Sequence, residues 1–169
     1  LITESELSTS DYGLAISGTA TVVDGLTISN SIFNNGGVAG FSIDDATVNS
    51  LLIQDSEFVS SPGFALFFSE AKIAPFTFER SLVRGNLGGV IIQNDCVLGD
   101  VMFDGVSVEF HGVGGLMIGG GTTATSLTIR GGHFEGNWGE EIGLSLTVTG
   151  ETRIVNNSFD GPFISIAFF

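Results

Sequence analysis

A repeat of about 25 residues is the feature that most constrains how this chain can fold. Successive copies of one eight-residue stretch begin 25, 25, 25, 26 and 25 residues apart. The copies start at Leu26, Leu51, Phe76, Val101, Leu127 and Thr152. A fixed period of roughly 20–50 residues is typical of solenoids, propellers and other repeat arrays. The chain is therefore expected to stack one structural unit many times.

Within each copy, apolar side chains occupy fixed positions. The third position holds Ile28, Ile53, Phe78, Phe103, Ile129 and Ile154. The eighth holds Phe33, Phe58, Val83, Val108, Phe134 and Phe159, which predicts a continuous aromatic ladder inside the molecule. A second apolar alternation follows about fifteen residues into each copy, as in Phe41/Ile43 and Leu66/Phe68. A third ladder precedes each copy at Val23, Val48, Ile73, Leu98, Thr123 and Val148. Short period-two runs rich in Val, Ile and Phe indicate strands.

Three short strands in a repeat of this length predict an all-β fold, a right-handed parallel β-helix of about six to seven coils. A propeller blade needs four strands and roughly 40 residues, which this period does not reach. The 25 glycines suit tight corners between strands. The whole chain, residues 1–169, is expected to form one domain, with an irregular first coil over 1–25 and regular coils over 26–169. We expect this unit to be a segment of a longer solenoid or to stack end to end with others.

Composition narrows the classes of partner. The chain has 19 acidic and 5 basic residues, and its net charge is −14. No basic stripe exists to neutralise phosphates, so nucleic acid and anionic lipid are disfavoured as partners. The apolar runs are far shorter than the ~20 residues that a membrane-spanning helix needs. Cys96 is the single cysteine, so no disulfide can form within the chain.

The corner after the first strand of each repeat carries a recognisable motif. The sequence reads Val83-Arg84-Gly85-Asn86-Leu87-Gly88-Gly89 in one copy and Phe134-Glu135-Gly136-Asn137 in another. These runs resemble the Phe-x-x-Asn and Gly-Gly-[Ile/Leu/Val] repeats of polymorphic outer-membrane proteins. More broadly, the chain resembles the pectin-lyase-like superfamily of parallel β-helices. That resemblance implies a secreted or cell-surface protein, either adhesive or acting as an enzyme on polysaccharides.

One outward column offers candidates for catalysis. Glu79, Asp104 and Arg130 occupy the fourth position of consecutive repeats, and Arg80 lies beside Glu79. Two carboxylates one coil apart approach the spacing of a retaining glycosidase, and an arginine could stabilise an anion on an acidic sugar. The alternative interpretation is that these charges compensate one another on a solvated surface, where ion pairs contribute little. The second interpretation is favoured.

Two further columns offer candidates for binding. Glu109, Glu135 and Asp160 bring three carboxylates into consecutive coils, and Ca²⁺ is the cofactor that would suit them. The alternative is that these corner side chains point apart into water, with no cofactor. Phe110, His111 and Trp138 could instead form an aromatic surface on which a sugar stacks; a Trp at such a corner more often covers the core. Neither His111 nor His133 has an adjacent Ser or Cys nucleophile in the sequence, so no nucleophilic triad is predicted.

For function, the sequence favours a non-catalytic structural or adhesive segment, a stiff extracellular rod or filament subunit. Its partners would be other copies or segments of the same protein, or extracellular glycans. The alternative is a polysaccharide lyase or glycoside hydrolase that acts on an acidic glycan at the face carrying Glu79 and Asp104. A shallow groove with raised carboxylate pKa values would favour the enzyme.

Overall fold

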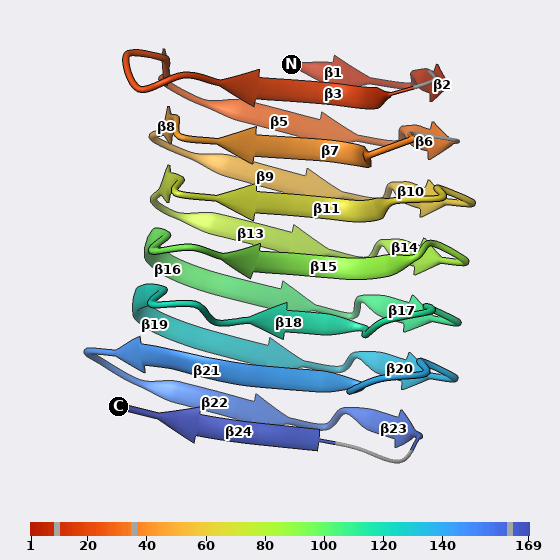
Figure 1. Cartoon of the computed structure of the whole chain (residues 1–169), viewed down its shortest axis with the longest axis vertical. Coiled ribbons are helices and arrows are strands. Elements are labelled where there is room, and N and C mark those ends of the chain that lie inside the picture. The colour runs from red at the N-terminus through yellow and green to blue at the C-terminus, as the bar shows by residue number, and fades with distance from the viewer. Residues whose placement is uncertain (9–10, 35–36, 162–163) are drawn as a thin grey trace.

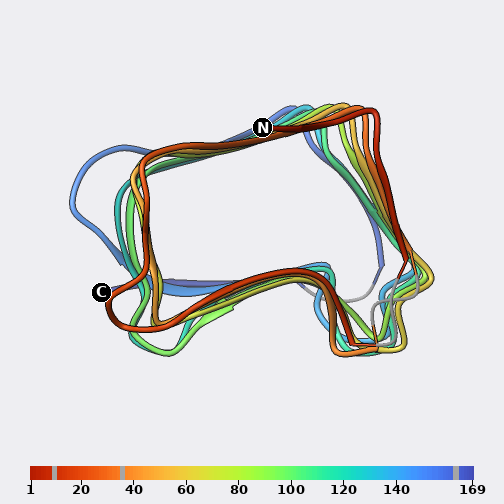
Figure 2. The same cartoon turned by 90° about the horizontal axis from the view of Figure 1, so that it is seen from above.

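The computed structural model describes residues 1–8, 11–34, 37–161 and 164–169, and these residues form 24 strands and no helix. The strands wind into a parallel β-solenoid of about six turns (Figure 1). Seen along its axis, the coils superpose closely, so the cross-section is nearly constant (Figure 2). The predicted fold class, an all-β solenoid with a period near 25 residues, is confirmed.

Each coil contributes one strand to each of three faces. The first face contains β1 (Ile2–Thr3), β5 (Leu26–Ser29), β9 (Leu51–Gln54), β13 (Phe76–Glu79), β16 (Val97–Asp104), β19 (Thr123–Arg130) and β22 (Thr152–Val155). The second contains β2 (Glu6–Ser8), β6 (Ile32–Asn34), β10 (Glu57–Val59), β14 (Leu82–Arg84), β17 (Ser107–Glu109), β20 (His133–Glu135) and β23 (Ser158–Asp160). The third contains β3 (Tyr12–Ser17), β7 (Ala39–Asp44), β11 (Phe64–Ser69), β15 (Gly88–Gln93), β18 (Leu116–Ile118), β21 (Ile142–Val148) and β24 (Ile164–Phe168).

Two-residue strands complete the earlier coils at the edge between the third and first faces. They are β4 (Val22–Val23), β8 (Thr47–Val48) and β12 (Lys72–Ile73). In the fourth and fifth coils this short strand merges with the next first-face strand, giving the eight-residue β16 and β19, and in the sixth it merges with the third-face strand β21. Residues 1–25 contain four strands that pair with the coil below, at offsets that change from 26 residues at Ile2–Ile28 to 27 at Tyr12–Ala39.

The eight-residue repeat is two strands joined by a corner rather than one strand. The fifth residue of the stretch has a positive φ in every copy, including 49° at Asn30, 50° at Asp55, 45° at Arg80 and 63° at Gly105. This left-handed conformation turns the chain from the first face to the second. The bend explains why apolar positions three and eight both face inward although they are five residues apart.

Buried serines stabilise this corner from inside. The hydroxyl of Ser56 accepts the backbone N–H of Ser31 one coil above at 3.2 Å and donates to the carbonyl of Gln54 at 2.8 Å. Ser81 repeats the pattern, accepting from Ser56 N–H at 3.1 Å. Each serine therefore supplies hydrogen-bond partners to backbone groups that the corner removes from water.

The core is apolar, and its aromatic side chains do not form one ladder. Phe33 and Phe58 stack with centroids 4.6 Å apart, and Phe134 and Phe159 stack at 5.3 Å. Val83 and Val108 separate the two pairs in the same column. The predicted continuous ladder is therefore wrong in the middle coils, where Phe76, Phe78 and Phe103 from the first face fill the space instead.

One predicted ladder position shifts by a residue. Ala124, which is 2% exposed, pairs with Leu98 above and Val148 below, whereas Thr123 pairs with Val97 and Thr147. The extra residue of the single 26-residue step therefore lies before Ala124. Counting 25 residues from Leu98 places the polar Thr123 in the core position, and the buried contact goes to alanine instead.

Candidate functional site

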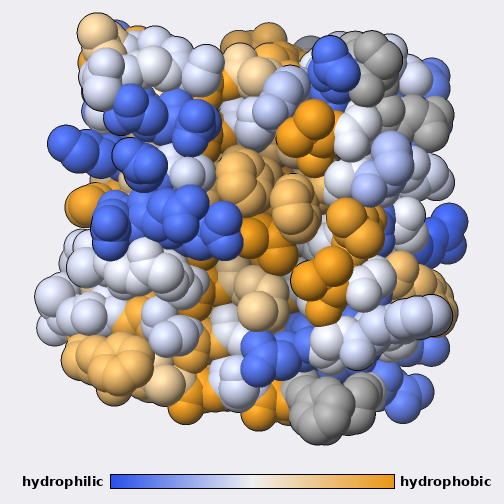
Figure 3. All heavy atoms as spheres, in the orientation of Figure 1, coloured by the Kyte–Doolittle hydropathy of each residue, from blue (hydrophilic) through white to orange (hydrophobic). Residues whose placement is uncertain are grey.

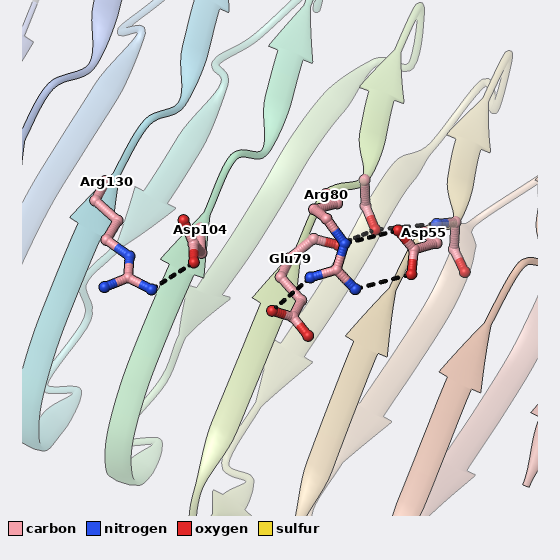
Figure 4. A network of polar contacts seen from close by, with 7 residues as sticks. Asp55, Glu79, Arg80, Asp104 and Arg130 are labelled. Carbon is pink, nitrogen blue, oxygen red and sulfur yellow. Dashed lines mark hydrogen bonds and ion pairs between the residues drawn. The ribbon is translucent and has the colours of Figure 1, made fainter.

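The predicted catalytic residues form a column of ion pairs where the first face turns into the second (Figure 4). Glu79 and Asp104 are register partners in the neighbouring strands β13 and β16, and Asp104 and Arg130 are register partners in β16 and β19, as the repeat predicted. Each charged side chain has a partner of opposite charge. The Arg130 Nη2 atom lies 2.6 Å from Asp104 Oδ2, and Arg80 Nη1 lies 2.9 Å from Glu79 Oε2.

Arg80 also holds Asp55 in a two-pronged contact. Its Nε and Nη2 atoms donate to the two oxygens of Asp55, both at 2.9 Å. The two residues occupy the same corner position in adjacent coils, and both adopt a positive φ. Because the corner fixes both backbones, the guanidinium and carboxylate planes meet in the geometry that arginine favours.

These pairings set the protonation of the carboxylates. The hydrogen bond from Arg130 lowers the pKa of Asp104, and the hydrogen bond from Arg80 lowers the pKa of Asp55. General-acid catalysis on a glycosidic bond needs a carboxyl whose pKa is raised. Asp104 is shifted the opposite way, and Glu79 is engaged by Arg80. The geometry therefore supports a compensated surface column more than an acid–base pair.

The three carboxylates considered for Ca²⁺ are stacked but do not converge. Glu109 and Glu135 are register partners in β17 and β20, and Glu135 and Asp160 are register partners in β20 and β23. Glu109 instead accepts a hydrogen bond from Ser107 at 2.5 Å, and Glu135 contacts His133 at 3.0 Å. Across the described part of the chain, no group of three or more His, Cys, Asp and Glu side chains is arranged to hold a metal ion.

The predicted aromatic surface divides into exposed and buried members. Trp138 is 86% exposed and Phe110 is 53% exposed, at the corners between the second and third faces. His111 is fully buried, so its ring cannot offer a surface to a sugar. Leu87 and Val113, 48% and 51% exposed, lie at the same corner of neighbouring coils. We call Leu87, Phe110, Val113 and Trp138 the apolar corner.

His111 belongs to a polar ladder inside that corner. Asn86 Oδ1 accepts the N–H of Ser61 at 2.8 Å, and Asn86 N–H donates to His111 Nδ1 at 3.3 Å. The N–H of His111 then donates to Asn137 Oδ1 at 3.0 Å. The Asn of the Phe-x-x-Asn motif is therefore an internal corner residue, and His111 replaces it in the coil between Asn86 and Asn137. Burial lowers the pKa of His111, which keeps the ring neutral in this ladder.

The structure brings together three residues that the sequence did not connect. The Ser158 hydroxyl lies 2.7 Å from His133 Nδ1, and His133 Nε2 lies 3.0 Å from Glu135 Oε2. Ser158 and His133 are 25 residues apart and pair directly across β20 and β23. The signal was present in the period, since a residue 25 or 26 positions from a histidine is its neighbour in the adjacent coil.

The third face carries apolar surface as well as charge. Figure 3 looks onto this face and shows hydrophobic side chains gathered along its middle and towards the apolar corner. Hydrophilic side chains lie on both sides of them, with the largest group on the left of this view. On β11, Phe64 and Phe67 stack with centroids 5.2 Å apart.

Comparison of the chain with protein-family models, with curated proteins and with solved structures finds no match. In the described ranges, no helix is long and apolar enough to cross a membrane.

Proposed function

We propose that this chain is a structural or adhesive element that acts outside the cell, as a stiff rod with partners along its surface and at its ends. The observation that carries the proposal is the hydrogen bonding of buried polar side chains from coil to coil inside the solenoid. Serine hydroxyls link the coils of Ser31, Ser56 and Ser81 at one corner, and side chains link the coils of Asn86, His111 and Asn137 at another. Internal hydrogen bonds between neighbouring coils resist bending and sliding, which a load-bearing rod requires, since each repeat contacts only its neighbours.

The charged column supports the same function. Its arginines are engaged by carboxylates of this chain, which leaves them poorly placed to hold an acidic substrate. Exposed pairs of this kind contribute little to stability, but they keep a strongly acidic surface locally compensated. The resemblance to polymorphic outer-membrane protein repeats supports an extracellular location.

The partners that we propose are further coils of the same kind and extracellular glycans. In the last coil, Ile164, Ile166 and Phe168 are 44–49% exposed, and Ile166 pairs with the buried Leu144. Another coil stacked on β24 would cover these side chains and pair its strand edge. The apolar corner offers Trp138 as a ring for a sugar face, since its indole is 86% exposed.

Glycan binding can be measured directly because Trp138 is the single tryptophan of the chain. Intrinsic fluorescence therefore reports on this corner alone. Titration with extracellular oligosaccharides should give a saturable change in emission, and Phe110→Ala should weaken the binding while it keeps the fluorophore. A flat titration across neutral and acidic oligosaccharides would refute glycan binding at this corner.

End-to-end stacking is tested by sedimentation of the purified chain over a range of concentrations. We expect mass to rise with concentration and elongated particles to appear in electron micrographs. Ile166→Lys should prevent this association, whereas Val97→Lys, at a 50% exposed position on the side of the rod, should not. A mass that is independent of concentration, or equal loss in both variants, would refute stacking through the end coil.

A further inference from the structure

We propose that Ser158, His133 and Glu135 form a nucleophilic site that accepts uncharged acyl groups from esters. The Ser158 Oγ atom is 2.7 Å from His133 Nδ1, and His133 Nε2 is 3.0 Å from Glu135 Oε2. A nucleophile within hydrogen-bond reach of a base, with the base oriented by a third group, is the arrangement that activates serine. This proposal goes beyond the structural role, and neither depends on the other.

The solenoid itself builds this arrangement. His133 and Glu135 are two residues apart on β20, so both side chains leave the same side of the strand. The register of the parallel pair places Ser158 of β23 directly beside His133. The Ser158 N–H donates to the Gly132 carbonyl at 2.9 Å, which fixes the backbone under the hydroxyl. All three side chains therefore stand on one outer sheet surface, on rigid strands rather than on a loop.

The hydrogen-bond inventory decides the roles of the two ring nitrogens. The Glu135 carboxylate only accepts, so in neutral His133 the Nε2 atom carries the proton and donates it to Oε2. Nδ1 then has a free lone pair and accepts the hydroxyl proton of Ser158. The two nitrogens exchange the positions that they hold in most Ser–His–carboxylate triads, but the direction of proton transfer is the same.

The chemical step balances with these three groups and water. Ser158 Oγ attacks the ester carbonyl carbon, and its proton passes to His133 Nδ1. The tetrahedral adduct collapses, the bond to the leaving oxygen breaks, and His133 returns the proton to that oxygen, releasing an alcohol. Water then attacks the acyl-serine, gives one proton to His133, and releases the carboxylic acid as Ser158 Oγ takes the proton back. Glu135 stabilises the imidazolium in both halves without changing protonation.

The surroundings define the class of ester. The side chains of His133 and Glu135 are 43% and 37% exposed, so an acyl group carried by a large extended molecule can reach them. Glu109 and Asp160 flank Glu135 in adjacent coils. Their negative charge repels anionic acyl groups. The site therefore favours esters of uncharged acyl groups, such as acetyl groups borne by a polymer.

The chain provides a matched control. Ser107 on β17 and Ser158 on β23 lie in the same column as His133, Ser107 one coil above it and Ser158 one coil below it. Its hydroxyl donates to Glu109 Oε1 at 2.5 Å and therefore has a carboxylate partner in place of an imidazole. The two serines share strand position and surface, and they differ in the group that receives the hydroxyl proton, a carboxylate for Ser107 and an imidazole for Ser158.

The test is labelling by a fluorophosphonate, with the modified serine identified by peptide mass spectrometry, together with hydrolysis of p-nitrophenyl acetate. We expect selective labelling of Ser158, and His133→Gln should slow it about 100-fold, the range of a general base. Ser158→Ala should abolish labelling and hydrolysis, and Ser107→Ala should change neither. Circular dichroism confirms that each variant is folded. Labelling of Ser158 no faster than of Ser107, or an unchanged rate in His133→Gln, would overturn the proposal.

Discussion

The polar ladder inside the corner between the second and third faces makes a sharp prediction at Asn86. This side chain is 4% exposed and makes three hydrogen bonds to backbone groups. Its Oδ1 accepts from Ser61 N–H at 2.8 Å, and its Nδ2 donates to the carbonyls of Phe58 and Arg84 at 3.1 and 3.2 Å. Truncation to alanine removes all three bonds in a site that water does not reach.

The magnitude is obtained from those bonds. Each intramolecular hydrogen bond contributes about 1 kcal/mol net, and a buried polar group deprived of its partner costs about 1–3 kcal/mol. Three lost bonds and the space left by the amide therefore predict that Asn86→Ala lowers the free energy of unfolding by about 3–5 kcal/mol. For a domain of this size, about 2–4 °C of Tm corresponds to each kcal/mol, so Tm should fall by roughly 10 °C.

Urea and thermal unfolding followed by circular dichroism measure this loss. Asn86→Asp keeps an oxygen for Ser61 N–H but directs a second oxygen at the two carbonyls, so it should cost at least as much at neutral pH. The control is Asn49→Ala, because the exposed Asn49 side chain donates to Asp24 at 3.3 Å in a solvated pair, and its change should stay within about 0.5 kcal/mol. The reasoning fails if Asn86→Ala or Asn86→Asp is as stable as Asn49→Ala.

Two further predictions concern packing and pH. A Cβ at Gly89 would lie 2.2 Å from the carbonyl oxygen of Gly115, so Gly89→Ala should lower the free energy of unfolding by about 1–3 kcal/mol. A Cβ at Gly25 would have no atom within 4 Å, so Gly25→Ala should be neutral or slightly stabilising. Urea denaturation measures both changes. Burial lowers the pKa of His111 in the folded state, so the unfolded chain binds the additional proton. Stability should therefore be complete above the ordinary histidine pKa of about 6.5 and should fall as pH drops below it. His111→Asn, which introduces the side chain present at Asn86, should flatten that fall between pH 7 and 5, and an unchanged slope would contradict the assignment.

Much of the fold could be predicted because a solenoid repeats its strand register. The spacing of the third and eighth positions identified the paired core residues, from Ile28 with Ile53 to Phe134 with Phe159. Where the count slipped by one residue, at Thr123, the register was wrong as well. The period also predicted that Glu79, Asp104 and Arg130 form one column.

Side-chain direction at the corners could not be predicted in the same way. Nothing in the local sequence distinguishes His111, which faces inward, from Phe110, which adopts a φ of 58° and faces outward. Along a strand, successive side chains alternate between the inner and outer sides of the sheet. The positive φ of Phe110 interrupts this alternation at the corner, so that His111 faces the core and Phe110 faces outward.

The sequence by itself determined that the chain winds with a period near 25 residues and buries one apolar set per coil, because the hydrophobic pattern requires parallel strands in register. Only the tertiary structure decided which polar groups meet. Arg80 engages Asp55, Asn86 fills the corner, and Ser158 reaches His133, since each contact joins side chains about 25 residues apart whose directions depend on how the corners turn. Hydrogen bonds depend on angle and on tenths of an ångström, whereas apolar burial depends mainly on which side of a strand a residue occupies.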